Sequence, residues 1–296
     1  MNKKSLWYNV FADLAAADRR IVLALDELPI LVNKLLRDEN GVVTPQGRQK
    51  AEEFLSWLRK IGQAHGERVT LILSGSIGLE PILEQNGLST NVNIFAPYEL
   101  KPWSESTAAN CLSELATTYG IDLPQEVRLD MCRRLGCCIP HHVQLYFDKM
   151  HSHLRGKGLQ SASLDDSRTV YRESMLGVHA NVGMVHYEHR LETTLGSAGY
   201  RIAHDFLTYT AAWGRLEDDV VKQCRDHLAM KATDSSDADR LVKNVLLVLG
   251  HDGYLVHKNG GRRFVSAYLK DWWRNRHQEF LGPANELAIR MPGEKQ

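Results

Sequence analysis

Two short apolar runs constrain the fold of this chain more than any other feature of its sequence. Ile21–Leu25 and Val69–Leu73 are rich in β-branched residues, and each is followed by polar residues. Runs of this length are typical of strands buried on both faces of a parallel sheet. Between them, Gln49–Ile61 has apolar residues at helical spacing, as in the crossover helix that a parallel pair requires. We therefore expect an α/β fold with these strands as neighbours, and a weaker third strand at Val92–Phe95.

After Pro97 the pattern changes from strands to helices. Apolar spacing and proline positions predict helices over Ser104–Tyr119, Pro124–Leu135 and Pro140–Leu154, which would form a small helical subdomain. The stretch Arg155–Ser167 is rich in Gly, Ser and charged residues and indicates a boundary. We expect three parts: an α/β core over 1–98, a helical subdomain over 99–158, and a helical region over 159–296.

The C-terminal part predicts a helix followed by a hairpin. Ala238–Leu249 is amphipathic, and short apolar segments flank Asn259-Gly260-Gly261. Asn-Gly between two such segments is a strong hairpin pattern. With a last helix over Ser266–Gln278, this order is typical of a winged helix.

Composition excludes several classes of protein. The chain has 36 Lys+Arg against 36 Asp+Glu, and a net charge of zero argues against coating nucleic acid or anionic membrane through bulk electrostatics. Its most apolar stretch, Ile21–Val32, contains Asp26 and Glu27 and is too short and too polar to span a membrane. The N-terminal apolar residues, Leu6 to Leu14, have the spacing of an amphipathic helix. Five cysteines without a C-x-x-C pair indicate neither a disulfide framework nor a zinc ribbon, so we expect a cytoplasmic protein.

Two adjacent carboxylates, Asp26 and Glu27, end the first predicted strand. Ligand sites of α/β sheets lie at the carboxyl ends of the strands, where the first acid can hold Mg²⁺ and the second can orient the attacking water. This is the Walker B arrangement of ATPases, although a strand can also simply end in charged residues. The second strand ends in Ser74-Gly75-Ser76, and there Ser76 could hydrogen-bond a phosphate or its water, or be a turn residue.

In combination and in this order, Leu25–Pro29, Leu73–Leu79, Gly136–Pro140 and Arg263–Trp273 resemble prokaryotic AAA/STAND-type P-loop ATPases. The resemblance covers nearly the whole chain and implies a P-loop NTPase parallel sheet, a helical lid and a C-terminal winged-helix domain. It implies ATP and Mg²⁺ as ligands, with Asp26 as the magnesium-side acid, Glu27 as the catalytic glutamate and Ser76 as a sensor. It also implies that the nucleotide docks at Gly136 and Pro140, the latter against the adenine.

One part of the family pattern is missing. The phosphate-binding motif G-x-x-x-x-G-K-[ST] should precede Walker B, but only 20 residues precede Ile21. Gly156-Lys157 is followed by Gly158 and is not such a loop. We therefore expect an incomplete sheet with exposed or rearranged apolar surface, in a truncated or split ATPase that is inactive without a P-loop. The missing segment on a partner, or self-association, would complete it.

Three other interpretations remain open. Ser74 to Gly78 resembles the nucleophile elbow of serine hydrolases, with Ser76 as nucleophile, although no oxyanion-loop motif accompanies it. Cys137-Cys138 and His141-His142 could hold zinc, but adjacent ligands on a short turn diverge, and buried cysteines are the simpler interpretation. His151 and His153 are expected to be solvated.

The third alternative is a non-catalytic module that binds DNA or protein through the winged helix. Its basic residues could contact DNA phosphates. They are Lys258, Arg262, Arg263 and Arg274.

Overall fold

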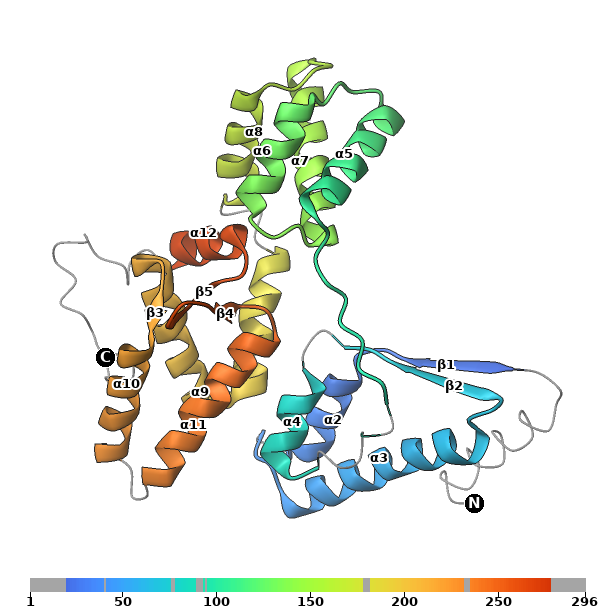
Figure 1. Ribbon diagram of the computed structural model, residues 1–296, viewed down its shortest axis with the longest axis vertical. Coiled ribbons are helices and arrows are strands. Elements are labelled where there is room, and N and C mark those ends of the chain that lie inside the picture. The colour runs from blue at the N-terminus through green and yellow to red at the C-terminus, as the bar shows by residue number, and fades with distance from the viewer. Residues whose placement is uncertain are drawn as a thin grey trace. The chain divides into compact units, whose positions relative to one another are not determined.

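The computed structural model describes residues 20–39, 41–75, 78–88, 93, 95–177, 182–231 and 235–277. The chain divides into two compact units, Met1–Tyr98 and Glu99–Gln296, which are described separately (Figure 1). Three predictions fall wholly or partly outside the described residues: the helix at residues 6–14, the position of Ser76, and residues 92 and 94 of the strand over 92–95.

The first unit contains the predicted parallel strand pair. Strands β1 (Ile21–Leu25) and β2 (Val69–Leu73) have the predicted bounds and pair in parallel, with Ile21 opposite Val69 and Leu25 opposite Leu73. Helix α3 (Pro45–His65) is the predicted crossover and is longer than its apolar pattern. Each strand is followed by a helix, β1 by α2 (Leu28–Leu36) and β2 by α4 (Leu79–Asn86), and the sequence analysis does not predict α2.

The start of α3 fixes its position against α2. Thr44 caps the helix, because its Oγ1 accepts a hydrogen bond from the Gly47 amide at 3.0 Å. A Cβ at Gly47 would lie only 2.2 Å from the Leu36 carbonyl oxygen, so this close approach requires glycine. Buried residues of α2, α3 and α4 form the core beside the carboxyl ends of the strands, and they include Leu28, Val32, Leu36, Leu55, Leu58, Ile82 and Leu83.

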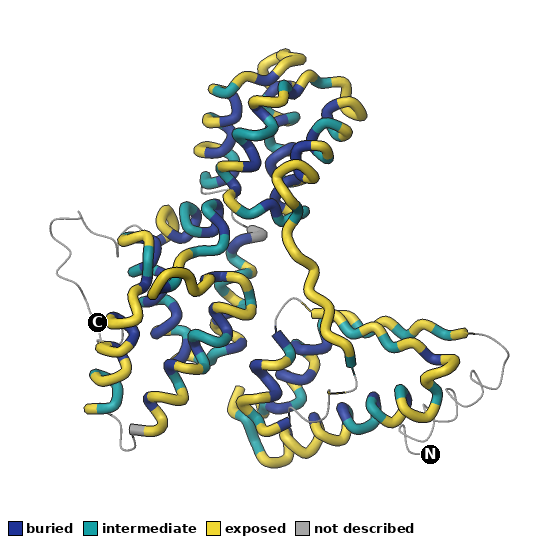
Figure 2. Tube along the Cα trace, viewed as in Figure 1, coloured by how far each residue is buried: buried dark blue, intermediate teal, exposed yellow. Residues whose placement is uncertain are grey.

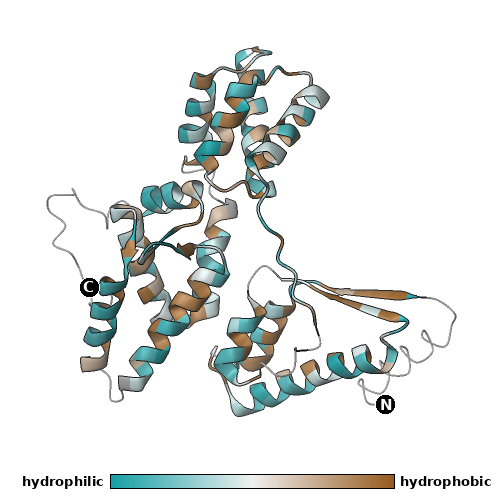
Figure 3. Cartoon of the chain, viewed as in Figure 1, coloured by the Kyte–Doolittle hydropathy of each residue, from teal (hydrophilic) through white to brown (hydrophobic). Residues whose placement is uncertain are grey.

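The two strands are covered on one face only. Ile61 of α3 packs with Val69, and the odd-numbered residues of both strands lie on this face. On the other face Val22 is 64% exposed and Ile72 is 50% exposed. The strands are among the most apolar segments in Figure 3, yet Figure 2 shows them largely half-buried or exposed. The prediction of strands buried on both faces is therefore wrong for the described part of the sheet, in which no third strand pairs with them and no helix covers the second face.

The second unit begins with helices close to those predicted. They are α5 (Glu105–Tyr119), α6 (Gln125–Leu135), α7 (Pro140–Lys157) and α8 (Leu164–Val170), followed by a π-helical turn over Tyr171–Met175. The expected boundary at 155–167 is mostly helical. Helix α7 continues to Lys157 and is capped by Gly158 in the left-handed conformation, and α8 begins six residues later with a Ser163 capping box.

The remaining elements surround a small antiparallel sheet. Helix α9 (Val182–Trp213) is interrupted at Gly196, and it is followed by α10 (Asp218–Lys231) and α11 (Ser235–His251). The sheet has the order β3–β5–β4, from Leu216–Glu217, Gly261–Phe264 and Leu255–His257. The β4–β5 hairpin confirms the Asn-Gly prediction, because Asn259 and Gly260 both have positive φ.

Helix α12 (Ala267–Arg276) closes the second unit against α6 and α9. Its Trp272 and Trp273 are fully buried in one hydrophobic cluster that extends from Ala108 to Trp273. The Ser266 hydroxyl donates to the Leu135 carbonyl oxygen at 3.1 Å, which joins the start of α12 to the end of α6. In the described part of the chain, no helix is long and apolar enough to cross a membrane.

Candidate functional site

The structure brings Asp26 and Ser74 together at the carboxyl ends of the two parallel strands. Because Leu25 lies opposite Leu73, the next residues along each strand also lie side by side. The Ser74 hydroxyl donates to Asp26 Oδ1 at 2.7 Å, and the Glu27 amide donates to the same oxygen at 2.9 Å. Among the described residues, none forms a hydrogen bond with Asp26 Oδ2. The Asp26 carboxylate is thus held in place through Oδ1, while Oδ2 forms no hydrogen bond with the described residues.

These two hydrogen bonds also set the charge of Asp26. The side chain is exposed, and the Ser74 hydroxyl, followed by the Glu27 amide, lowers the pKa of this carboxyl below its ordinary value. Donors of this kind stabilise the carboxylate relative to the acid. Asp26 is therefore an anion at neutral pH, as a residue that binds a cation must be.

Glu27 is in an unusual backbone conformation. It has φ 55° and ψ 34°, in the left-handed region, and it precedes the first turn of α2. The sharp turn is closed by the Leu28 amide, which donates to the Ser74 carbonyl oxygen at 3.0 Å, and by Pro29 in the first turn of α2. A left-handed conformation at a residue other than glycine is unfavourable and often occurs at functional sites.

Ser74 is the site residue that the sequence analysis did not identify. The predicted sensor, Ser76, lies outside the described residues, so its position relative to Asp26 is not tested. The register could have indicated Ser74, because it is the first residue after β2 and Asp26 is the first after β1. The sequence analysis instead assigns the functional hydroxyl to Ser76, two residues further along the chain.

Gly136 and Pro140, the predicted nucleotide-docking residues, belong to the second unit. Gly136 caps α6 with φ 67°, and a Cβ there would lie 2.7 Å from the Ala267 Cβ of α12. Pro140 is half-buried in the first turn of α7. The structure therefore gives Gly136 a packing role, whatever its part in binding a ligand.

The predicted basic surface is partly neutralised. Arg262 lies 2.6 Å from Asp218, and His257 lies 3.2 Å from the same carboxylate. Lys258, Arg263 and Arg274 are exposed, and no described residue forms an ion pair with them. The accessible positive charge near the hairpin is therefore smaller than the number of basic residues in the sequence suggests.

The structure gives no support to zinc at the Cys-His segment. No group of three or more His, Cys, Asp or Glu that could hold a metal ion occurs among the described residues. Burial raises the pKa of the Cys132 thiol to about 12 and also raises the pKa values of Cys137 and Cys138, which disfavours thiolate ligands. Burial likewise lowers the pKa of His142 to about 4, and its ring packs against Tyr268.

His151 and His153 are expected to be solvated, but both are half-buried and contact other side chains. His153 Nε2 lies 2.9 Å from Asp166 Oδ1, and the His151 ring contacts Tyr119 and Phe147. Both histidines lie on α7, and their partners are Asp166 on α8, Tyr119 at the end of α5 and Phe147 on α7 itself.

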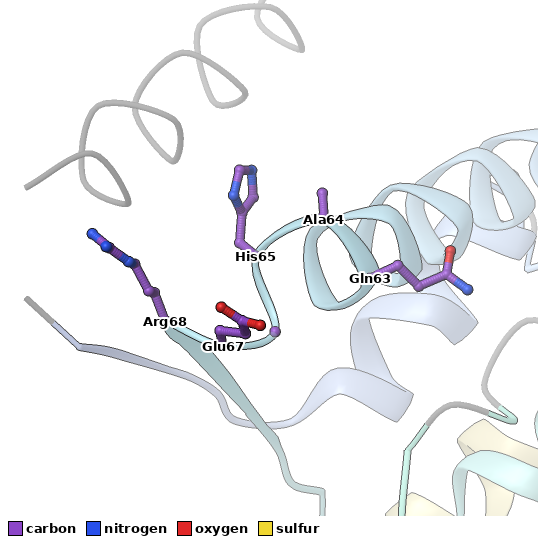
Figure 4. Close-up of a pocket in the computed structure, with 6 residues that line it drawn as sticks. Gln63, Ala64, His65, Glu67 and Arg68 are labelled. Carbon is purple, nitrogen blue, oxygen red and sulfur yellow. The ribbon is translucent and has the colours of Figure 1, made fainter.

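A surface pocket occurs at the opposite end of the sheet. It lies at the turn between α3 and β2, and His65, Glu67 and Arg68 are among the residues that line it (Figure 4). These residues precede β2, whereas Ser74 follows it. The pocket is therefore separate from the Asp26 site and contains no arrangement of catalytic groups.

With its parallel strand pair and crossover helix, the chain has a fold similar to that of P-loop ATPases. The chain is similar to the Walker-type ATPase PABY2304 of Pyrococcus abyssi, with 14% identity and a TM-score of 0.56 over 93% of this chain and 68% of that chain. It is also similar to the RuvB Holliday junction branch migration motor of Thermotoga maritima, with 11% identity and a TM-score of 0.43 over 89% and 72%, a score that supports no conclusion by itself. No protein-family model and no curated protein matches the sequence. The likeness to the Pyrococcus protein supports the predicted P-loop ATPase-like fold in general.

Proposed function

We propose that this protein is an ATP-binding and ATP-hydrolysing protein of the AAA/STAND type, whose site is completed by a phosphate loop outside these 296 residues. The observation that carries the proposal is the Asp26–Ser74 hydrogen bond. It holds an ionised carboxylate at the carboxyl ends of two parallel strands, where α/β sheets bind their ligands. In this proposal α5, α6 and α7 form a helical lid, and α11, β4, β5 and α12 form a winged helix.

The residues present fit the proposed ligands. Asp26 Oδ2 is the kind of hard oxygen that Mg²⁺ prefers, and one or two carboxylates with phosphates and waters usually complete such a site. Bound Mg²⁺ would neutralise charge on the phosphates. Glu27 would orient the attacking water, Ser76 would bond the terminal phosphate, and Gly136 and Pro140 would dock the base.

The phosphate-binding part is the element that must come from elsewhere. The sequence contains no G-x-x-x-x-G-K-[ST], and Gly156-Lys157 forms the last turn of α7, so its amides are not arranged as a phosphate cradle. The exposure of the Val22 and Ile72 side chains supports the proposal, because a further strand or helix could cover this apolar face. A P-loop segment, on this or another polypeptide, or a second copy of the chain would provide the rest.

Binding and hydrolysis of Mg·ATP test the proposal. The 296-residue chain alone should bind ATP more weakly than micromolar and should not hydrolyse it. Co-expression with the polypeptide encoded immediately upstream, if that contains the motif, should produce ATPase activity, and Asp26→Asn or Glu27→Gln should lower it by at least about 100-fold. Glu39→Gln, at an exposed acid away from the strand ends, is the matched control. Micromolar affinity in the chain alone would show that the phosphates bind somewhere else.

A second candidate is a DNA-binding or protein-interaction module. The exposure of Lys258, Arg263 and Arg274 favours it, because these charges remain available to phosphates. Titration of a duplex DNA at several salt concentrations should show steep salt dependence, and Arg263→Glu with Lys258→Glu should abolish binding. Arg262→Glu tests the ion pair with Asp218 instead and should affect stability more than DNA affinity. DNA binding that is insensitive to salt would exclude DNA recognition through these charges.

A further inference from the structure

The two oxygens of the Asp26 carboxylate differ in their capacity to bind a cation. An ionised carboxylate oxygen has two lone pairs, and each can accept a hydrogen bond or bind a cation. On Oδ1 both are taken, by the Ser74 hydroxyl at 2.7 Å and by the Glu27 amide at 2.9 Å. A cation that approaches this carboxylate can therefore bind it only through Oδ2.

The backbone of Ser74 is fixed from both sides, so its hydroxyl is held on Oδ1. The Ser74 amide donates to the Leu25 carbonyl oxygen at 3.0 Å, and the Ser74 carbonyl oxygen accepts from the Leu28 amide at 3.0 Å. Leu25 and Leu28 flank the turn that contains Asp26 and Glu27. The hydroxyl and the carboxylate therefore share one frame, formed by the ends of β1 and β2 and the start of α2. Asp26 is exposed, so a solvated ion can approach it.

Divalent cations differ in how they use a carboxylate. Ca²⁺ takes about six to eight oxygen ligands in a flexible geometry and commonly binds both oxygens of one carboxylate. Mg²⁺ requires a nearly octahedral shell, keeps several waters and is bound through one or two carboxylates. A carboxylate that offers a single oxygen therefore suits Mg²⁺ and removes one ligand from Ca²⁺.

We propose that Ser74 biases the Asp26 site toward Mg²⁺ and against Ca²⁺, because its hydroxyl occupies Oδ1 and prevents the carboxylate from binding one ion through both oxygens. Ser74 is thus a positioning residue that acts through Asp26. The inference rests on the proposed Mg·ATP site and adds the choice of ion to it. In Ser74→Ala only the Glu27 amide remains on Oδ1, which frees one lone pair for Ca²⁺.

Binding of ions to the 296-residue chain without ATP tests the inference. Mn²⁺ is the probe, because it prefers the same oxygen ligands as Mg²⁺ and broadens the ¹H–¹⁵N amide signals of nearby residues. Mg²⁺ and Ca²⁺ are then titrated as competitors that restore these signals, which gives the dissociation constant of each. The ratio of the Ca²⁺ constant to the Mg²⁺ constant should be about tenfold lower in Ser74→Ala than in the wild type, since the partners of a metal ligand typically change metal affinity by about 10–100-fold.

Three variants separate the hydroxyl from other effects of the substitution. Ser74→Thr keeps a hydroxyl and should keep the wild-type ratio. Ser161→Ala, which removes a hydroxyl bonded to Asp122 in the second unit, is the matched control and should also keep it. Asp26→Asn should abolish the broadening of the amides at residues 26–28. The same spectra show whether each variant is folded.

Two results would overturn the inference: equal ratios in the wild type and Ser74→Ala, or Mn²⁺ broadening near Asp26 that is absent or that survives Asp26→Asn. The proposed function fails on a different observation, the absence of ATPase activity when the phosphate loop is supplied. A ratio that depends on Ser74 without such activity would contradict the proposed function alone. ATPase activity with equal ratios would contradict the role of Ser74 alone.

Discussion

The strained backbone of Glu27 leads to a prediction about stability. A left-handed conformation costs a residue with a Cβ about 1–2 kcal/mol, whereas glycine adopts it freely but loses about 0.5–1 kcal/mol of chain entropy. Because Glu27 has φ 55°, we expect Glu27→Gly to raise the free energy of unfolding of the first unit by about 0.5–1 kcal/mol. Asn259→Gly, at the hairpin turn with φ 53°, is the comparison, and its gain should be smaller since asparagine tolerates this conformation. Urea unfolding measures both, and a destabilised Glu27→Gly would show that the glutamate side chain contributes more than its strain removes.

The hydrogen bond from Ser74 should be visible in the titration of Asp26. Since the Ser74 hydroxyl is the largest cause of the lowered pKa, Ser74→Ala should raise the pKa of Asp26 toward its ordinary value. Carboxyl ¹³C chemical shifts followed with pH measure this directly. Ser161→Ala, which removes a hydroxyl bonded to Asp122 in the second unit, should leave Asp26 unchanged. Equal pKa values in the wild type and Ser74→Ala would mean that the two side chains do not meet.

The sequence is least informative about contacts between individual side chains. Asp26 and Glu27 could be chosen because an acid pair after an apolar run has a chemical meaning. Ser74 could be found only from the strand register, because it lies 48 positions from Asp26 and no local pattern joins the two. Long-range pairs of this kind follow from packing, which a single sequence does not show.

At the scale of elements, Asp166 gives α8 a pH-dependent contribution. Hydrogen bonds from Ser163 are the largest cause that lowers the pKa of this carboxyl, with further help from His153 and Lys157. A lowered pKa stabilises the fold above the unfolded value of about 4, and this stabilisation is lost as pH falls below it. Asp166→Asn should therefore destabilise the protein at pH 7, and the difference from the wild type should shrink as pH falls below about 4. Asp165→Asn, its exposed neighbour, should show little difference at either pH in thermal unfolding.

Gly136 and Gly158 both cap helices, so their alanine variants distinguish the cost of backbone strain from the cost of a packing clash. Gly136 and Gly158 have φ 67° and 66°, but a Cβ at Gly136 would lie 2.7 Å from Ala267, whereas nothing lies within 4 Å at Gly158. Gly158→Ala should cost about 1–2 kcal/mol for its conformation alone. Gly136→Ala should cost about 1–3 kcal/mol more, because α6 and α12 must move apart. Equal losses in urea unfolding would mean that the α6–α12 contact adapts without penalty.

Elements were predictable where one local pattern determines them. The β1 and β2 bounds and the C-terminal ends of α5 and α6 follow from apolar runs and from Gly120 and Gly136 after the last helical residues. The sequence analysis does not predict α2, because it assigns Leu28 and Pro29 to the end of the acid motif. The exposure of Val22 and Ile72 could not be predicted, since an apolar run shows what a strand could bury and not what covers it.

At the scale of the whole molecule, each unit has a hydrophobic core of its own, and this predicts two unfolding transitions. The first unit buries Leu58 in the core of α2, α3 and α4, and the second buries Phe206 in the cluster that extends to Trp273. Leu58→Ala should destabilise the first unit by about 2–5 kcal/mol and Phe206→Ala the second by about 3–5 kcal/mol. Calorimetry should then show one transition shifted in each variant, and hydrogen exchange should assign it to α3 or to α9. A single transition that both substitutions shift together would show instead that the two units unfold as one cooperative body.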